Sequence, residues 1–167
     1  GYVSEHSGYH HGEMSLNKGI VGMAQEFVGS NNINHLLPKG QFGTRLLGGK
    51  DSASERYIFT NLNPLTKHVI HPHDNPILNY LNDDGTMVEP EYYMPIIPMV
   101  VVNGGKGIGT GFSYEGLSYN PRDVVQYLKC VLKGETPNID FIPYYQGFTG
   151  SVERIAPKKY IIKGPTK

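Results

Sequence analysis

Glycine and proline limit the length of every regular element that this chain can form. The 167 residues include 21 glycines and 12 prolines, and both residue types interrupt helices and strands. The sequence therefore predicts mixed α and β structure with many turns and several strands rather than a long helical bundle. Because 38% of the residues are hydrophobic, the chain can still bury the core of one or two small domains.

Charge, cysteine content and apolar runs exclude several classes of protein. Fifteen basic and fifteen acidic residues give no net charge, so affinity for nucleic acid has to come from local clusters. The single cysteine, Cys130, excludes a disulfide framework and fits a reducing intracellular compartment. The longest apolar stretch, Met94–Val102, is far shorter than the roughly 20 residues of a membrane helix. Since the chain begins with Gly1 and not with methionine, we expect a piece of a longer protein.

Apolar spacing and turn residues predict two helices. Apolar residues recur at helical spacing from Leu16 to Val28, and Gly29 stands where such a helix would end. A second helix is predicted to begin with Asn120 as its N-cap and Pro121 in its first turn, and to end before Gly134.

Other segments are predicted to be strands and hairpins. Arg56–Leu62 is dense in aromatic and β-branched residues and is interpreted as a strand, although Ser52-x-x-Glu55 could instead cap a helix. Val100–Val102 is predicted to be a buried strand. Asp83–Gly85 is the predicted turn of a hairpin, and Ala156–Lys158 is the predicted joint between two C-terminal strands.

Glycine-rich and histidine-rich segments suggest nucleotide and metal sites, but their spacing fits neither. Gly48–Lys50 and Gly104–Gly111 match neither the dinucleotide-binding motif nor the phosphate-loop motif. Two histidine groups lack a nearby carboxylate pair at a known ligand spacing: His6, His10 and His11, and separately His68, His71 and His73. We therefore expect no metal site in this chain.

Tyr57 follows a glycine-rich stretch that carries basic side chains. Arg45, Lys50 and Arg56 lie within twelve residues of it, among glycines that let backbone amides approach an anion. These residues predict a phosphate site, where a tyrosine hydroxyl could attack phosphorus and form a covalent phosphotyrosine. The alternative is a half-buried strand tyrosine without a chemical role.

Several longer motifs occur in a fixed order, and together they give the chain a specific resemblance. They are Tyr9–Glu13, Ala24–Asn32, Gly40–Tyr57, Val88–Tyr93 and Asn103–Gly111. From Tyr9 to about Tyr160 the chain resembles the type IIA DNA topoisomerases, in particular eukaryotic-type topoisomerase II. Gly105-Lys106 and Phe112 replace the Ala-Glu and tryptophan usual in that family, which indicates a divergent member and a large DNA virus as one candidate source.

The resemblance implies both a fold and a function. The fold is α+β, with a winged-helix domain in residues 1–98 that carries the catalytic tyrosine and the N-terminal part of a mixed α/β tower (shoulder) domain in residues 99–167. The function is that of a fragment of the cleavage-religation core of an ATP-dependent topoisomerase. Because other domains of the enzyme are missing, the fragment alone is expected to be inactive.

The resemblance also implies roles for individual residues. Tyr57 would attack the DNA phosphodiester and form a transient 5′-phosphotyrosine link during double-strand passage. Arg56 would stabilise the pentavalent transition state, and His11 holds the place of the family's supporting histidine. Ile108 holds the place of an isoleucine that wedges between base pairs and bends DNA, while its structural alternative is a loop residue packed into the core.

Further candidate residues surround these. Besides Ile108, the expected DNA contacts are Arg45, Lys50, Gln25, Ser30 and Asn31. For Gln25, Ser30 and Asn31, a solvated surface or a capping role is an equally ordinary alternative. Met14 lies where the family's drug-contacting methionine sits.

In the family, the tyrosine of one protomer works with metal-bearing carboxylates of the other, so the expected partners are double-stranded DNA and a second copy of the whole enzyme. Mg²⁺ and ATP would be bound by domains absent from this chain. The expected location is intracellular: the nucleus for a cellular protein, and the host cytoplasm or nucleus for a viral one.

Two alternatives to cleavage remain open at the level of sequence. One is a non-enzymatic winged-helix module that binds duplex DNA and does not use Tyr57. The other is an interaction fragment without a role at nucleic acid, which is consistent with the zero net charge. Salt-dependent DNA binding would argue against the latter.

Overall fold

The computed structural model describes residues 1–165, which contain both helices and small antiparallel sheets. This confirms the predicted α+β class. The contacts group the chain into two compact units: residues 1–25 with 34–96, and residues 26–33 with 97 onward. The assignment of 1–98 to a winged-helix domain and of 99–167 to a tower domain stays a prediction.

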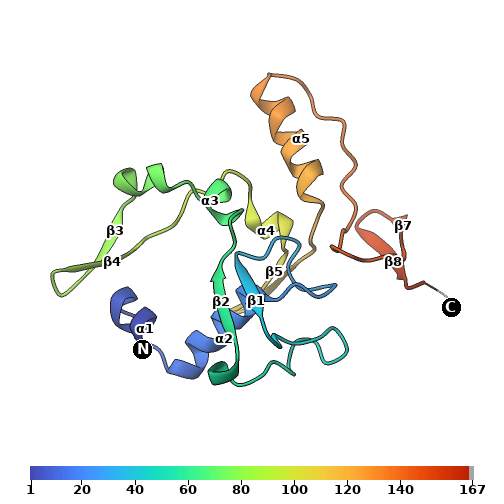
Figure 1. The fold of residues 1–167 in the computed structure, drawn as a ribbon. Helices are drawn as coiled ribbons and strands as arrows, with labels where there is room; N and C mark the ends of the chain where they lie inside the picture. Colours follow the sequence, from blue (N-terminus) through green and yellow to red (C-terminus); the bar gives the residue numbers. More distant parts are fainter. Residues whose placement is uncertain (166–167) are drawn as a thin grey trace. The chain divides into compact units, whose positions relative to one another are not determined.

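In the first unit, helix α2 packs against the antiparallel pair β1–β2, while β3 and β4 form a separate hairpin (Figure 1). Its helices and strands, of which η1 and η2 are 3-10 helices, are α1 (Tyr2–Ser7), α2 (Glu13–Ala24), β1 (Leu36–Lys39), η1 (Glu55–Tyr57), β2 (Phe59–Leu62), α3 (Thr66–Val69), η2 (Pro72–Ile77), β3 (Tyr80–Asp83) and β4 (Thr86–Pro90).

The helix predicted over Leu16–Val28 exists as α2, but both predicted ends are wrong. It begins at Glu13 and ends at Ala24, and Gln25 has an extended backbone (φ −61°, ψ 133°). The Gln25 side-chain amide donates to two carbonyl groups of a neighbouring loop, and the residues after it pack in the second unit. Tertiary contacts therefore end the helix before its apolar periodicity does.

The strand predicted over Arg56–Leu62 is also shorter than expected. Its first residues form the 3-10 turn η1, in which the backbone N–H of Tyr57 donates to the Ser54 carbonyl at 2.9 Å. Strand β2 starts only at Phe59, which pairs with Lys39, the last residue of β1. Because β1 offers no partner beyond that point, the aromatic residues before Phe59 do not extend the ladder.

The predicted hairpins are confirmed. The turn between β3 and β4 places Asp84 (φ 47°) and Gly85 (φ 86°) in the left-handed region, and the Asn82 side-chain carbonyl accepts from the Gly85 N–H at 2.7 Å. This is the turn geometry that a two-residue hairpin requires. The C-terminal hairpin turns at Pro157 and Lys158.

The second unit contains two hairpins and two helices. Its elements are α4 (Met99–Val102), β5 (Gly105–Gly109), β6 (Phe112–Gly116), α5 (Pro121–Leu132), β7 (Ser151–Ala156) and β8 (Lys159–Lys163). Strand β5 pairs with β6, and β7 pairs with β8. Helix α5 begins as predicted, since the Asn120 side chain accepts from the Arg122 N–H at 3.0 Å.

The strand predicted over Val100–Val102 is wrong, because these residues form the single helical turn α4. The N–H groups of Val101 and Val102 both donate to the Pro98 carbonyl, at 3.0 and 3.2 Å. Val102 is fully buried. Its β-branched side chain thus packs in the core from a helical turn and not from a strand. Here tertiary packing overrides the β-propensity of valine.

One asparagine ties the second unit together. The Asn32 side-chain N–H₂ group donates to the carbonyls of Val102, Tyr119 and Tyr144 at 2.8, 3.3 and 3.0 Å. Its carbonyl oxygen accepts from the Gln146 N–H at 2.8 Å. A single partly buried amide therefore joins three segments that are far apart in sequence.

Asn103 forms further hydrogen bonds with the backbone at Asn32 and Ile33. Its side-chain carbonyl accepts from the N–H groups of Asn32 and Ile33, both at 2.9 Å, and its N–H₂ group donates to the Ile33 carbonyl at 2.9 Å. Asn103 lies two residues before the start of the β5–β6 hairpin, so its hydrogen bonds hold the segment that leads into this hairpin.

None of the helices in the described part of the chain is long and apolar enough to cross a membrane.

We predict that Asn32→Ala lowers the free energy of unfolding of the chain by about 2–3 kcal/mol, because it leaves several partly buried carbonyl groups without a donor. Denaturant unfolding measures the change. The matched control is Asn138→Ala, an exposed loop asparagine of the same unit, for which a change within about 0.5 kcal/mol is expected. Equal losses in the two variants would contradict the role of Asn32.

Candidate functional site

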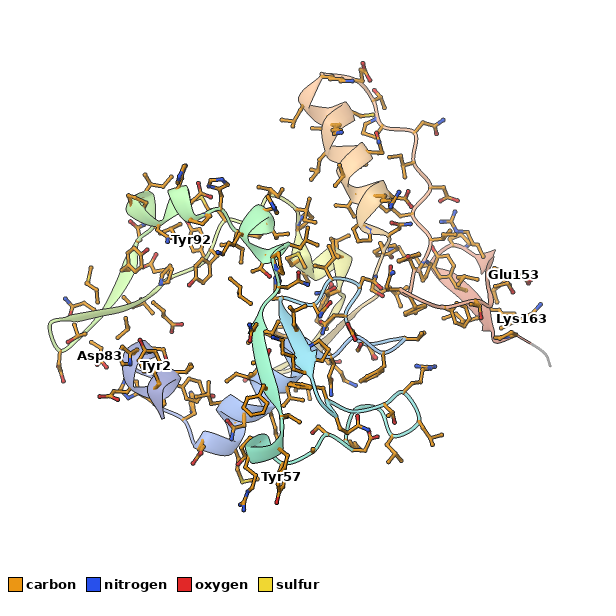
Figure 2. The ribbon with its side chains drawn as sticks, viewed as in Figure 1. Tyr2, Tyr57, Asp83, Tyr92, Glu153 and Lys163 are labelled. Carbon is orange, nitrogen blue, oxygen red and sulfur yellow. The ribbon has the colours of Figure 1, made fainter. Side chains whose placement is uncertain are left out.

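Tyr57 lies at the end of the short turn η1, and its side chain is 72% exposed. Figure 2 shows this side chain extending away from the ribbon. The alternative of a half-buried strand tyrosine is therefore wrong on both points. The hydroxyl is open to a large substrate.

Arg56 accompanies Tyr57 on the same turn. The centre of its guanidinium group lies 6.0 Å from the centroid of the Tyr57 ring, at the outer limit of a cation–π contact. Exposure alone does not single out Tyr57, since Tyr2 and Tyr92 are also exposed. The neighbouring positive charge of Arg56 distinguishes the surroundings of Tyr57 from those of Tyr2 and Tyr92.

A groove of about 570 Å³ lies next to this turn. One wall is the face of α2 that carries Met14, and the other wall is the segment that leads to η1. The lining residues are Met14, Asn17, Lys18, Val21, Gly22, Gln25, Gly48, Gly49, Lys50, Ser52, Ala53 and Glu55. The candidate residues Met14, Gln25 and Lys50 thus border one hollow, together with Glu55 of η1 itself.

The loop of residues 43–51 forms part of this wall and is closed by a carboxylate. Asp51 accepts from the Thr44 N–H at 2.8 Å and from the Thr44 hydroxyl at 2.7 Å. These hydrogen bonds hold the pKa of the Asp51 carboxyl below its ordinary value. The stems of the loop also touch, because a Cβ on Gly43 would lie 2.7 Å from the Cα of Gly49.

Gln25 joins the end of α2 to both stems of this loop. Its N–H₂ group donates to the carbonyls of Phe42 at 2.9 Å and Gly49 at 3.2 Å. Gly49 has a φ of 80°, in the left-handed region that favours glycine, and a Cβ there would also meet the Gln25 side-chain amide. Glycine is therefore required at this position. The amide of Gln25 has a structural role here, and its predicted contact with DNA stays a prediction.

His11 lies in the segment just before α2. Its ring packs edge-on against Tyr9, with the centroids 5.5 Å apart. The preceding residue, His10, contacts Asp83 of the β3–β4 hairpin through its Nε2 at 2.9 Å. Figure 2 shows Asp83 on that hairpin, close to α1. The contact of His10 with Asp83 thus holds the segment that contains His11.

Of the remaining candidates, Arg45 is exposed on the loop of residues 43–51 in the first unit, and the others belong to the second unit. The Ser30 hydroxyl donates to the Phe27 carbonyl, and the Ser30 N–H donates to the same oxygen at 2.9 Å, so Ser30 closes a turn. Asn31 is partly buried. Ile108 is 85% exposed on β5, opposite Ser113 of β6. This confirms the expected exposure of Ile108 and excludes the alternative of a core residue.

Two contributors to the site were missed in the sequence. Lys18 lies one turn after Met14 on the same face of α2, a spacing that could have revealed it. Asp51 gives no such signal, because its pairing with Thr44 depends on how the loop closes.

Within residues 1–165, no three His, Cys, Asp or Glu side chains come together in a way that could hold a metal ion.

Comparison with known proteins gives consistent matches. A family model that describes the A subunits of DNA gyrase and topoisomerase IV matches residues 1–167. The chain is 56% identical to DNA topoisomerase 2 of Pisum sativum, 57% to that of Bombyx mori and 53% to DNA topoisomerase 2-alpha of Sus scrofa. Each match covers 98% of this chain but only 11%, 10% and 11% of the respective relative.

A solved structure agrees with these matches. The crystal structure of the Plasmodium falciparum topoisomerase II DNA-binding, cleavage and re-ligation domain is similar with a TM-score of 0.90 and 49% identity. The match covers 95% of this chain and 22% of the solved one.

We predict that the hydrogen bonds of Asp51 can be followed by pH titration. The folded pKa of Asp51 is lowered, so its stabilisation of the loop is present above the free-chain value of about 3.9 and is lost as the pH falls through the folded value. The NMR shift of the Thr44 amide proton should therefore titrate with a midpoint below about 3.9, and Asp51→Asn should abolish this transition. A midpoint at or above the free-chain value would contradict the hydrogen bonds that Asp51 accepts from Thr44.

Proposed function

The chain belongs to the DNA gyrase/topoisomerase IV family, and from this premise we propose that it forms part of the DNA cleavage and religation core of a type IIA DNA topoisomerase. The observation that supports this most strongly is the exposed Tyr57 next to Arg56 on a turn between a loop with basic residues and a strand. Since the chain spans about a tenth of the length of the curated relatives it matches, the activity proposed is that of a longer enzyme.

In the proposed reaction, the Tyr57 hydroxyl oxygen forms a bond to a backbone phosphorus atom of DNA. The bond between phosphorus and the 3′ oxygen breaks, the tyrosine proton passes to a base or to water, and the released 3′ oxygen takes up a proton. The product is a 5′-phosphotyrosine link that conserves the energy of the phosphodiester. The reverse attack by the 3′ hydroxyl reseals the strand.

Arg56 and His11 would stabilise the charge that develops on the phosphoryl oxygens. A guanidinium group that already lies next to the nucleophile needs little reorganisation when the transition state forms. His11 would act from the segment anchored by the contact of His10 with Asp83.

DNA would contact both units. In the first, Arg45 and Lys50 are exposed cations near the groove, and Gln25 is proposed to face DNA from the end of α2. In the second, Ser30 and Asn31 are proposed contacts and Ile108 is the proposed wedge. For Ile108, its high exposure on a hairpin supports insertion between base pairs.

The groove beside η1 is the proposed place for small-molecule poisons of the enzyme, because it borders both Met14 and the segment that leads to the nucleophile. Substitution of Met14 would then alter drug sensitivity without abolishing relaxation of supercoiled DNA.

The rest of the enzyme supplies the remaining chemistry. We propose that Mg²⁺ is bound by carboxylates of another domain, that ATP drives strand passage from a further domain, and that two copies assemble around the DNA. The proposed location is the cell nucleus, or the host cytoplasm or nucleus for a viral enzyme.

We predict that Tyr57→Phe in the full-length enzyme abolishes covalent attachment to DNA and leaves non-covalent binding unchanged, because only the attacking hydroxyl is removed. The covalent complex is measured on a denaturing gel after trapping with detergent. Tyr92→Phe, which alters another exposed tyrosine, is the control and should cleave normally. A covalent complex formed at the normal level by Tyr57→Phe would refute the assignment.

We also predict that Arg56→Ala and His11→Ala each slow the cleavage step on the order of 10²-fold or more, since each removes a group that stabilises transition-state charge. Single-turnover cleavage measures this step. Arg122→Ala is the control for the loss of an exposed arginine, because Arg122 lies in the first turn of α5 in the second unit. If both variants cleave DNA at the rate of the control, neither residue stabilises the transition state.

A further inference from the structure

The loop of residues 43–51 displays two adjacent leucines at its tip. Leu46 is 90% exposed and Leu47 is 56% exposed. Covering such side chains removes apolar surface from water, which favours association with a partner. The proposed cleavage chemistry assigns no role to either leucine.

The loop is closed, so its tip is held out from the protein surface. The Gly49 N–H donates to the Thr44 carbonyl at 2.8 Å, and the Gly48 N–H donates to the Arg45 carbonyl at 3.1 Å. Together with the contact of Thr44 with Asp51, these hydrogen bonds fix the shape of the loop before any partner arrives. A partner therefore gains the apolar contact at a low cost in conformational entropy.

The charge of the loop indicates the chemistry of that partner. Arg45 and Lys50 are exposed on the two sides of the leucines. The one carboxylate of the loop, Asp51, is engaged by Thr44. The tip is thus apolar and flanked by positive charge, a combination that suits a polyanion with apolar sugar and base edges.

We propose that the Leu46–Leu47 tip packs onto duplex DNA beside the cleavage point and helps to choose the site that is cut. This inference rests on the function proposed above. Its geometric support is that Gly48, Gly49 and Lys50 line the same groove as Glu55, the first residue of the turn that carries Tyr57. The tip would contact the deoxyribose faces and base edges, while Arg45 and Lys50 contact phosphates.

The test compares variants of the full-length enzyme on one linear duplex. The double variant Leu46→Ala/Leu47→Ala should raise the Kd for DNA about 10-fold and redistribute cleavage among the sites. Because no charge is lost, the slope of log Kd against log salt should stay unchanged. Arg45→Gln should instead reduce that slope by about 0.9. Leu132→Ala, at a leucine that is 86% exposed on α5, is the control and should change neither quantity.

Each outcome decides between the two proposals. If the unaltered enzyme forms no covalent link through Tyr57, the proposed function fails. If the link forms but the double variant matches Leu132→Ala in affinity and in cleavage pattern, only the inference about the tip is overturned. A double variant that weakens dimer formation in sedimentation and leaves DNA affinity unchanged also overturns it, because the leucines would then contact protein.

Discussion

Hydrogen bonds from side-chain amides to the backbone hold the segments of this chain together, because its strands are short. The sheets in its described part have two strands each, and such short elements leave many backbone groups without a partner. Asn32 and Asn103 satisfy several of these groups in the second unit, and Gln25 does so in the first. Removing such an amide would leave partly buried carbonyl groups of several segments without a hydrogen-bond donor. The tertiary structure therefore depends on a few residues.

This arrangement has a consequence for the proposed site. Gln25 and Asp51 give the loop before Tyr57 a defined shape, and β2 begins only two residues after Tyr57. Tyr57, the proposed nucleophile, thus lies on an exposed turn between the loop of residues 43–51 and strand β2. Such a place suits a residue that has to reach the backbone of a large polymer and then return to its starting position.

Sequence patterns correctly predicted the helix start and the turn that depend on residues adjacent in the chain. Asn120 and the Asp84-Gly85 turn act through their own neighbours, and both predictions are confirmed. The end of α2 depends on partners distant in the chain, and the start of β2 depends on where its partner β1 ends. Both predictions were wrong, as was the strand predicted at Val102. Of the candidate site, Tyr57 and Arg56 came from a basic glycine-rich stretch and a family resemblance. Asn32 went unnoticed because its hydrogen-bond partners lie 70 or more positions away.

The central claim is that Tyr57, among the 12 tyrosines of the chain, carries the DNA during the reaction. The most direct measurement traps the covalent complex of the unaltered full-length enzyme, digests the protein and the DNA, and maps the remaining nucleotide by tandem mass spectrometry. The account predicts a nucleotide joined through its 5′ phosphate to the peptide that contains Arg56 and Tyr57. A nucleotide on another tyrosine, or a link through a 3′ phosphate, would contradict it.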